Sequence, residues 1–478
     1  MDARVIQKVR PIYVDLDGTL IKTDLLWESL AMLARQHPLT LWRVPFWMAA
    51  GKARLKAELA KRIDFKAELL PYREELVAEL ASARADGRRI VLATGANERL
   101  AQAVADHLGI FDDVMASSDT INLTADRKLQ RIEAEADAHG FDYVGNSRED
   151  LCLLEASAEP TVVAPDRHAG HWQRQTGARR LNDDGSRARA ALHAMRPHQW
   201  AKNVLVFVPL TLSHDFLDFP MLIAGLLAFF SFSFAASSVY ICNDLLDLES
   251  DRRHKTKCRR PFASGTLPIP AGLKLAAGLF VAAFAISAFL PPDYRLILMA
   301  YLVMTSGYSL FIKRMLLIDT LVLAGLYTVR IVGGAAAADV GISFWLIAFS
   351  IFFFLSLALV KRYTEIVDFG GGAERSKTGR GYVDVDLETL SQAGMASGFA
   401  SVLVLALYID SSDVRHLYDV PWLIWPLCPL VLYIIVRIWV LARRNQMHDD
   451  PVVFIMHDWR SQIMIGLGAI MFLTASYV

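Results

Sequence analysis

Residues 243–265 read NDLLDLESDRRHKTKCRRPFASG and follow a long apolar run at residues 221–242. Asp244, Asp247 and Asp251 are spaced by three and four residues, so they share one face if the helix continues through them. Three carboxylates at the end of a membrane helix repel one another and are costly to bury, and a divalent cation removes both penalties. The stretch therefore predicts a Mg²⁺ site at a membrane surface, with Asp244 and Asp247 in catalytic positions.

A dense group of cations follows these carboxylates: Arg252, Arg253, His254, Lys255, Lys257, Arg259 and Arg260. Ammonium and guanidinium groups bind phosphate oxygens, so we interpret the stretch as a magnesium–diphosphate site. Its expected substrate contacts are Asn243, Lys257, Arg259 and Arg260. The alternative is a solvated loop in which the cations follow the positive-inside rule and the acids cap helices.

The rest of the chain divides by composition. It has 478 residues, of which 54% are hydrophobic, and its formal net charge is zero. Residues 1–190 predict a soluble domain and residues 200–478 a series of membrane spans, and the N-terminus has no apolar core of a secretion signal. The four cysteines form no CxxC pair and no metal-binding spacing.

Nine apolar runs have about the length that a membrane span requires. They cover residues 200–216, 219–242, 271–290, 294–312, 318–337, 342–360, 393–410, 421–442 and 461–478. The loops after every second run contain sixteen Lys and Arg residues: Arg252, Arg253, Lys255, Lys257, Arg259, Arg260, Lys313, Arg314, Lys361, Arg362, Arg375, Lys377, Arg380, Arg443, Arg444 and Arg460. The opposite loops contain two, Arg295 and Arg415, so we expect an inner-membrane protein with its charged loops and N-terminal domain in the cytoplasm.

The N-terminal part has strand signals that end in polar residues. An apolar strand at residues 12–14 runs into Asp15 and Asp17, and further strands are predicted at residues 89–95 and 141–144. Carboxylates after a buried strand lie at its carboxyl end, where α/β folds bind ligands. Strands that alternate with helical stretches predict a doubly wound parallel sheet.

These polar strand ends resemble, in order, the motifs of the haloacid dehalogenase (HAD) superfamily of phosphohydrolases: DLDGTL at 15–20, RIVLATG at 89–95, the lysine of 122–128 and GNSRED at 145–150. The resemblance implies that Asp15 is the nucleophile that forms an aspartyl-phosphate and that Asp17 is the general acid and base. Thr94 and Lys128 would hold the phosphoryl group, with Arg127 as the alternative cation.

The same resemblance implies a Mg²⁺ site formed by Asp15, Asn146 and Asp150. Asn146 stands where the family has an aspartate, so the site loses one charge, and the alternative to a phosphatase is a domain kept as a scaffold. We expect this HAD-like domain over residues 1–165, with a helical cap at about 21–88, and a basic linker over 166–195.

Residues 196–478 carry a second resemblance, in three ordered motifs: RPHQWAKN at 196–203, the stretch at 243–265 and KRYTE at 361–365. They resemble the UbiA superfamily of intramembrane transferases, and within it the decaprenyl-phosphate phosphoribosyltransferase branch. The resemblance covers about residues 190–478 and implies an all-α domain of nine transmembrane helices.

The third motif differs from that of the aromatic prenyltransferases of the superfamily, which carry a second DxxxD for a second Mg²⁺. This chain has Lys361 and Arg362 first, then Glu365 and Asp368. Cations at this place suit an additional phosphate monoester. Further expected substrate contacts are the polar residues of the apolar runs: Lys202, Tyr308, Lys313, Asp319 and Arg330.

We therefore expect Mg²⁺-dependent transfer of 5-phosphoribose from phosphoribosyl pyrophosphate to polyprenyl (decaprenyl) phosphate, with release of pyrophosphate. The HAD-like domain would remove the 5-phosphate of the product. One alternative is an aromatic prenyltransferase that uses an isoprenyl diphosphate, with a non-catalytic HAD domain, and another is a lipid-phosphate carrier or flippase. The expected partners are these substrates and membrane lipid, without nucleic acid, and a homo-oligomer is compatible with them.

Overall fold

The computed structural model describes residues 10–136, 140–181, 185–213, 218–368, 381–411, 421–447 and 450–477. The chain forms two compact units. The first combines Met1–Ala194 with Tyr240–Leu275, and the second combines Met195–Val239 with Ala276–Val478. The aspartate-rich stretch therefore belongs to the same unit as the N-terminal domain. The loop cations Arg375, Lys377, Arg380 and Arg415 lie outside the described residues.

A six-stranded sheet forms the centre of the first unit, in the order β3-β2-β1-β4-β5-β6. All neighbouring strands are parallel, and Tyr13 of the central strand lies opposite Val91 on one side and Tyr143 on the other. The doubly wound sheet confirms the predicted α/β class. The strands are β1 Ile12–Val14, β2 Ile90–Asn97, β3 Asp113–Ser117, β4 Asp142–Gly145, β5 Thr161–Val163 and β6 Arg179–Leu181.

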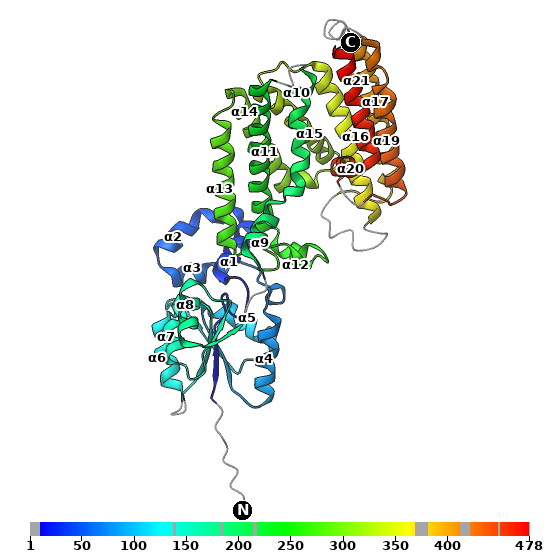
Figure 1. Cartoon of the computed structure of the whole chain (residues 1–478). Helices are drawn as coiled ribbons and strands as arrows, with labels where there is room; N and C mark the ends of the chain where they lie inside the picture. The colour runs from blue at the N-terminus through cyan, green and yellow to red at the C-terminus, as the bar shows by residue number, and fades with distance from the viewer. Residues whose placement is uncertain are drawn as a thin grey trace, which may run out of the picture. The chain divides into compact units, whose positions relative to one another are not determined.

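Both faces of this sheet are covered, because alternate strand residues point to opposite sides. Ile12 and Val14 join one apolar cluster with residues of α4 and α5, whereas Tyr13 joins the other with residues of α6, α7 and α8. Figure 1 shows α4 and α5 on one side of the strands and α6 to α8 on the other. The helices of this unit are α1 Leu25–Gln36, α2 Val44–Ala49, α3 Lys52–Ala60, α4 Glu74–Ala85, α5 Glu98–Leu108, α6 Ala125–Glu135, α7 Leu151–Ala156, α8 Arg167–Thr176 and α12 Leu248–Arg253, with 3₁₀ turns η1 Pro38–Arg43, η2 Ala67–Leu69, η3 Arg148–Asp150 and η5 Lys257–Arg259.

The prediction of a linker over residues 166–195 is wrong for the first half of this range. This part forms helix α8 and then strand β6, which pairs in parallel with β5 at the edge of the sheet. The sequence RRL of β6 has no apolar alternation, because an edge strand has little surface to bury. Helix α9, Arg187–Met195, follows it.

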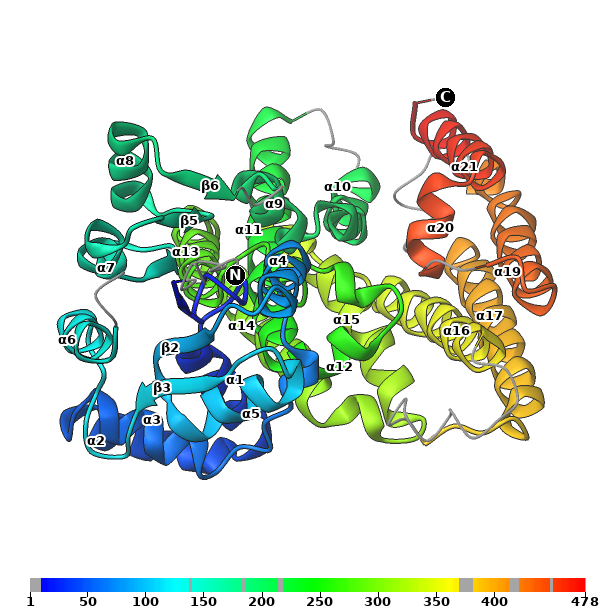
Figure 2. The same ribbon diagram turned by 90° about the horizontal axis from the view of Figure 1, so that it is seen from below.

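Helices make up the second unit, and Figure 2 shows α16, α17, α19 and α21 close together in it. They are α10 Val208–Leu212, α11 Phe219–Leu246, α13 Ile269–Ser287, α14 Pro292–Leu310, α15 Ile318–Ala337, α16 Phe344–Asp368, α17 Asp386–Ile409, α19 Leu427–Arg443, α20 Pro451–His457 and α21 Trp459–Tyr477, with 3₁₀ segments η4 Pro197–Phe207, η6 Ile312–Arg314 and η8 Pro421–Ile424. The C-terminal end of α11, from Tyr240, and the start of α13, up to Leu275, lie in the first unit.

Six helices of the described residues are long and apolar enough to cross a membrane, by length and composition: Phe219–Leu246, Ile269–Ser287, Ile318–Ala337, Phe344–Asp368, Asp386–Ile409 and Trp422–Arg443. The chain is thus a multi-pass membrane protein, but the count of nine spans is not confirmed. The described part of the run at 200–216, which ends at residue 213, contains most of η4 and the short α10. The 19-residue helix α14 carries Asp293 and Arg295 in its first turn, which lowers its apolarity.

Two glycines of α15 allow the backbone of η4 and a ring of α11 to approach this helix. A Cβ atom on Gly334 would lie 2.0 Å from the carbonyl oxygen of Val206, and one on Gly333 would lie 2.5 Å from a ring carbon of Phe232. Small residues at such crossings allow membrane helices to pack closely.

We predict that Gly334→Ala destabilises the second unit by about 1–3 kcal/mol, because its methyl group overlaps a backbone atom that cannot move alone. Gly278→Ala is the matched control, since the Cβ position at Gly278 in α13 has no atom within 4 Å. Thermal unfolding of the purified protein in detergent, followed by tryptophan fluorescence, measures the difference. Equal melting temperatures for the two variants would show that the crossing is loosely packed.

Candidate functional site

The predicted HAD residues meet at the carboxyl end of the sheet. Asp15 follows β1 directly, and its Oδ1 accepts a hydrogen bond from Nζ of Lys128 in α6 at 2.8 Å. The same ammonium group lies 3.8 Å from Oδ1 of Asp150. All three side chains are buried. The structure therefore brings a candidate nucleophile and its predicted cation together, from positions 113 residues apart.

Asp150 orders the loop that follows β4. Its Oδ2 accepts hydrogen bonds from the backbone N–H groups of Asn146 and Ser147, each at 3.1 Å, and from the Ser147 hydroxyl. Its Oδ1 accepts one from the hydroxyl of Tyr143. Asp150 thus fixes the loop that carries Asn146, and it does so with both oxygens.

Gly18 allows Asn146 to approach the first motif. Gly18 has a φ of +76°, and a Cβ atom there would lie 2.2 Å from the Asn146 amide nitrogen. Both the left-handed conformation and the close approach therefore require glycine. The amide side chain of Asn146 is held against the turn that follows Asp15.

Asp17 and Thr94 each accept a hydrogen bond from a backbone N–H group. Asp17 Oδ1 accepts a hydrogen bond from the N–H of Leu25, which joins the first motif to the start of α1. The Thr94 hydroxyl accepts one from the N–H of Ala96 and is buried. Asp17 belongs to the first predicted HAD motif, together with Asp15, and Thr94 belongs to the second.

Burial perturbs the acids of this site. Desolvation raises the pKa of Asp15 to about 6, partly opposed by the charge of Lys128. Desolvation, together with Asp24 and Asp15, raises the pKa of Asp17 well above its usual value. Burial disfavours the charge of Lys128, but Asp15 and Asp150 outweigh it and raise the pKa of this lysine. At neutral pH the arrangement gives an ionised Asp15 beside a protonated Lys128, as a nucleophile requires, and an Asp17 suited to donate a proton.

The residues fit a Mg²⁺ ion in part. Among the described residues, no group of three or more His, Cys, Asp or Glu side chains could hold a metal ion. Asp15 and the oxygen of the Asn146 amide remain as candidate ligands, with water and a substrate phosphate for the rest. Asp150 supports the loop through four hydrogen bonds.

A cavity of 830 Å³ opens at this end of the sheet, lined by Asp15, Asp17, Lys128 and Asn146. One wall comes from a distant part of the sequence, since Gly265, Thr266, Pro268, Ile269 and Pro270 also line it. These residues follow the aspartate-rich stretch and begin α13. All of the lining residues belong to the first unit.

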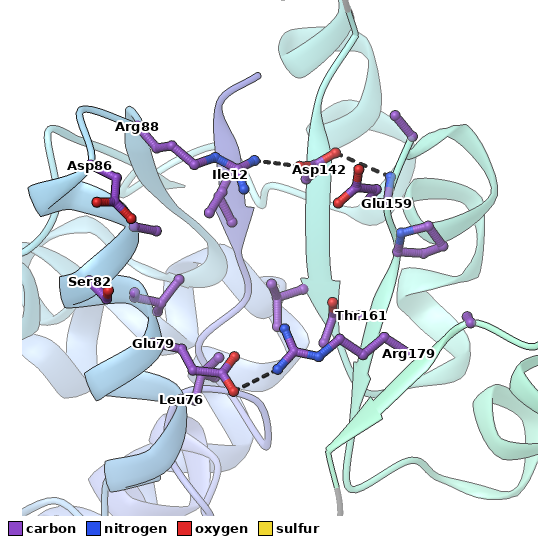
Figure 3. Close-up of a pocket in the computed structure, with 16 residues that line it drawn as sticks. Ile12, Leu76, Glu79, Ser82, Asp86, Arg88, Asp142, Glu159, Thr161 and Arg179 are labelled. Carbon is purple, nitrogen blue, oxygen red and sulfur yellow. Dashed lines mark hydrogen bonds and ion pairs between the residues drawn. The ribbon is translucent and has the colours of Figure 1, made fainter. Parts of the chain in front are cut away.

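A second cavity, of 640 Å³, lies at the opposite end of the sheet (Figure 3). Ile12, Thr161 and Arg179, which begin three strands, line it. Its charged groups pair with one another, as in Arg179 with Glu79 and Arg88 with Asp142. Ligands of α/β folds bind at the carboxyl ends of strands, so we do not assign a catalytic site to this cavity.

The aspartate-rich stretch does not place its three carboxylates on one face. Helix α11 ends at Leu246, and Asp247 is the N-cap of α12 with φ −100° and ψ 15°. The backbone N–H groups of Asp247 and Asp251 still donate to the carbonyl oxygens four residues before them, so the interruption is confined to Asp247. Asp247 lies 3.6 Å from Arg35 of α1 instead.

Asp244 and Asp251 nevertheless converge. Asp244 Oδ1 lies 3.2 Å and Asp251 Oδ2 lies 2.7 Å from the same nitrogen, Nη1 of Arg260. Burial raises the pKa of Asp251, opposed by the Arg260 charge. The guanidinium occupies a point between two carboxylates where a cation is stabilised. The pair therefore fits a Mg²⁺ site with two protein carboxylates, which is the usual number when a substrate phosphate supplies further oxygens.

The cations after these acids separate into two groups. Arg252 pairs with Glu28 of α1, and Arg253 pairs with Glu249 of its own helix, so neither faces the carboxylate pair. Lys257 and Arg259 are the first and last residues of η5, which ends directly before Arg260. Asn243 lies in the last turn of α11. Arg260 contacts both carboxylates directly, and the charge of Lys257 also acts on Asp251.

In the second unit, Asp450 joins two of the predicted cations. Its Oδ2 accepts hydrogen bonds from Nζ of Lys202 and from Nζ of Lys361, each at 2.9 Å. The hydroxyl of Tyr327 donates to the same carboxylate. The first and third motifs therefore meet on one carboxylate. Sequence reasoning assigned no role to Asp450, because Asp-Pro reads as the helix cap that it also is.

Arg330 lies beside this cluster and is also buried. It donates to Asn203 Oδ1 at 2.8 Å, to Tyr301 Oη at 3.1 Å and to the carbonyl oxygen of Leu326, all of them neutral acceptors. Arg330, Lys202 and Lys361 thus gather three positive charges around Asp450. A surplus of buried positive charge favours a bound anion.

Arg362 forms a separate network with Asp319. Its guanidinium is buried and bonds to Asp319, Glu365 and the hydroxyl of Tyr308. Tyr382 donates to the other oxygen of Asp319 at 2.5 Å. Asp319, an expected substrate contact, therefore pairs with Arg362. Lys313 lies in η6.

Comparison with known proteins gives a family for each part of the chain. Residues 204–459 match the UbiA prenyltransferase family, and residues 12–155 match the haloacid dehalogenase-like hydrolases. An uncharacterized protein of Sinorhizobium fredii, y4nM, is 36% identical over 99% of this chain and 93% of its own length. Decaprenyl-phosphate phosphoribosyltransferase of Mycolicibacterium smegmatis is 34% identical over 37% of this chain, and the match spans 56% of that enzyme.

A solved structure of a UbiA homolog from Archaeoglobus fulgidus, bound to GPP and Mg²⁺, is similar over 60% of this chain and all of its own. The sequence identity is 13% and the TM-score is 0.46.

We predict that Asp450→Asn destabilises the second unit by about 3 kcal/mol, because it leaves two ammonium groups on a neutral amide. This value is at the lower end for a broken buried pair, since Lys361 is partly exposed. Glu388→Gln, at an exposed position of α17, is the control. Thermal unfolding in detergent measures both, and an unchanged melting temperature of Asp450→Asn would contradict the charge argument.

Proposed function

This chain belongs to the UbiA prenyltransferase family, and we propose that it transfers 5-phosphoribose from phosphoribosyl pyrophosphate to a polyprenyl phosphate, with release of pyrophosphate. The observation that carries the proposal is the convergence of Asp244 and Asp251 on one nitrogen of Arg260. The similarity to decaprenyl-phosphate phosphoribosyltransferases supports the choice of donor and acceptor.

The donor diphosphate would bind at the aspartate-rich stretch. Asp244 and Asp251 would hold Mg²⁺, which neutralises the diphosphate and makes it a better leaving group. Arg260 would then pair with diphosphate oxygens, since its guanidinium suits both carboxylate and phosphate. The other substrate contacts proposed there are Asn243, Lys257 and Arg259, with Asp247 in a supporting position.

The acceptor phosphate would bind at the cations around Asp450. Lys202, Lys361 and Arg330 supply a surplus of positive charge, and Asp450 holds the two lysines in place through hydrogen bonds to both. An anionic phosphate is the ligand that such a group neutralises. The proposed contacts in this unit also include Tyr308, Lys313, Arg362 and Glu365.

The reaction requires no strong base from the protein. The bond between ribose C1 and the pyrophosphate oxygen breaks, and its electron pair leaves with pyrophosphate. A phosphate oxygen of the acceptor forms the new bond to C1 through an oxocarbenium-like state. Because the acceptor is already an anion, the chain has to bind and orient the two substrates.

An aromatic prenyltransferase is the second candidate, since the family takes its name from prenyl transfer. It would need carboxylates for a second Mg²⁺ at the KRYTE motif. Glu365 of this motif bonds to Arg362, and Arg362 also bonds to Asp319. The one acid of the KRYTE motif, Glu365, thus pairs with a guanidinium, which disfavours a second diphosphate–metal site there.

We also propose that the HAD-like domain removes the 5-phosphate of the transferase product, on the cytoplasmic side of the inner membrane. The support is a single cavity that is lined by Asp15 and Lys128 and also by residues that follow the aspartates, among them Gly265, Pro268 and Ile269. Asp15 would attack the phosphorus, the bond between phosphorus and the ribose 5-oxygen would break, and Asp17 would protonate that leaving oxygen. Water, with Asp17 as the base, would then hydrolyse the aspartyl-phosphate and release phosphate. Thr94 and Lys128 would bind the phosphoryl oxygens, with Asn146 and Asp150 at the metal side.

We predict that Asp244→Asn and Asp251→Asn each lower the transferase rate by at least 100-fold, because either change removes a charge from the converging pair. Asp247→Asn should cost tenfold or less, because this carboxylate faces Arg35. Thin-layer chromatography of lipid products measures the rates with purified protein, Mg²⁺, polyprenyl phosphate and labelled phosphoribosyl pyrophosphate. Full activity of Asp244→Asn would exclude the proposed donor site.

We predict that Asp15→Asn leaves the transfer rate unchanged but stops loss of the 5-phosphate, so that the phosphorylated lipid accumulates. Mass spectrometry of the lipid product separates the two species by one phosphate group. The control is Asp86→Asn, at an exposed position of the same unit. A dephosphorylated product from Asp15→Asn would show that the HAD-like domain does not carry out this step.

A further inference from the structure

The cap of the HAD-like domain holds the aspartate-rich stretch through a buried ion pair. Arg252 donates from Nη1 and Nη2 to the two carboxylate oxygens of Glu28 in α1, at 3.1 and 2.6 Å. The Arg252 side chain is 5% exposed and the Glu28 side chain is fully buried. Both residues belong to the first unit. A paired, bidentate geometry of this kind fixes the position and the orientation of both side chains.

Arg252 also reaches the other end of the stretch. Its Nε donates to the carbonyl oxygen of Ala263 at 3.0 Å, in the ASG segment that follows Arg260. One guanidinium thus connects α12, which carries Asp251, with the chain after Arg260 and with α1. Asp251 lies on α12 and Arg260 directly precedes the segment that contains Ala263, so Arg252 joins the parts of the chain that carry two of the three converging groups. The third, Asp244, lies in the last turn of α11.

Weaker contacts surround this pair. Asp247 lies 3.6 Å from Arg35, and Lys66 donates to Glu249 at 2.9 Å. These side chains are partly exposed, so each contact adds little by itself. A Cβ atom on Gly265 would also lie 2.6 Å from Cβ of Lys22, which shows how closely the stretch approaches the first HAD motif.

We infer that Glu28 of the HAD-like domain is a positioning residue for the transferase site. Through Arg252 it holds α12 and the segment after Arg260 in the arrangement that brings Asp244, Asp251 and Arg260 together. The inference rests on the proposed function of this stretch in binding the donor diphosphate. It gives the HAD-like domain a task in transfer that is independent of its own chemistry.

The test is Glu28→Gln in the full-length protein. This change keeps the shape of the side chain but leaves the buried Arg252 charge without a carboxylate. We expect the KM for phosphoribosyl pyrophosphate, or the Mg²⁺ concentration for half-maximal rate, to rise about tenfold. Hydrolysis of p-nitrophenyl phosphate by the same samples should change less than twofold, since Glu28 does not line the HAD cavity. A parallel loss of both activities would indicate general unfolding and would overturn the inference.

Two further variants separate positioning from stability. Glu28→Gln combined with Arg252→Gln removes the stranded charge, so we expect it to recover part of the loss seen in Glu28→Gln alone. Arg253→Gln is the matched control on the same helix, because its pair with Glu249 is exposed, and it should match the wild type. Equal KM values in Glu28→Gln and Arg253→Gln would refute the inference.

A readout without activity keeps the two proposals apart. Limited proteolysis or hydrogen exchange should show faster attack at residues 247–265 in Glu28→Gln than in the wild type, with no change at α4. An inactive wild type with this difference in protection would contradict the proposed function and leave the inference standing. An active wild type without the difference would contradict the inference alone.

Discussion

Charge burial is the constraint on which both units of this protein depend. A charged side chain that leaves water must find a partner of opposite charge and close geometry, or it destabilises the fold. Glu28 with Arg252, Asp15 with Lys128 and Asp450 with its two lysines each meet this requirement. Each pair also joins segments that are far apart in the sequence. The candidate functional residues are therefore held by the same contacts that order the fold.

These groups of paired charges differ in how much net charge they leave uncompensated. Glu28 and Arg252 balance each other with two hydrogen bonds, so the pair is suited to holding segments together. Around Asp450, one carboxylate faces two ammonium groups with Arg330 nearby, so the group has positive charge to spare. A balanced pair favours a structural task, whereas an unbalanced one favours a ligand. This difference separates the positioning contacts from the candidate binding sites.

The sequence predicted the parts of this structure that depend on local pattern. The α/β sheet followed from apolar strands that end in Asp15, Thr94 and residues 145–150, because the carboxyl ends of parallel strands meet at one edge. The membrane helices followed from apolar length. The family resemblances are confirmed for both parts of the chain, whereas the site residues that they implied and the roles of these residues stay predictions.

Long-range partners could not be predicted in this way. The shared face of Asp244, Asp247 and Asp251 assumed a continuous helix, and the interruption at Asp247 has no signal such as Pro or Gly. The sequence indicated a phosphate ligand at Arg252, which lies in a dense group of cations. Its partner, Glu28, lies 224 residues away, so no local pattern indicated the ion pair. Strand β6 was missed because an arginine-rich edge strand lacks the alternation by which strands are recognised.

The wall of the HAD cavity formed by residues 265–270 has a consequence for how such a chain can evolve. Ile269 and Pro270 line this cavity and are also the first residues of α13, a helix long and apolar enough to cross a membrane. Selection on the cavity and selection on the start of this helix therefore act on the same residues.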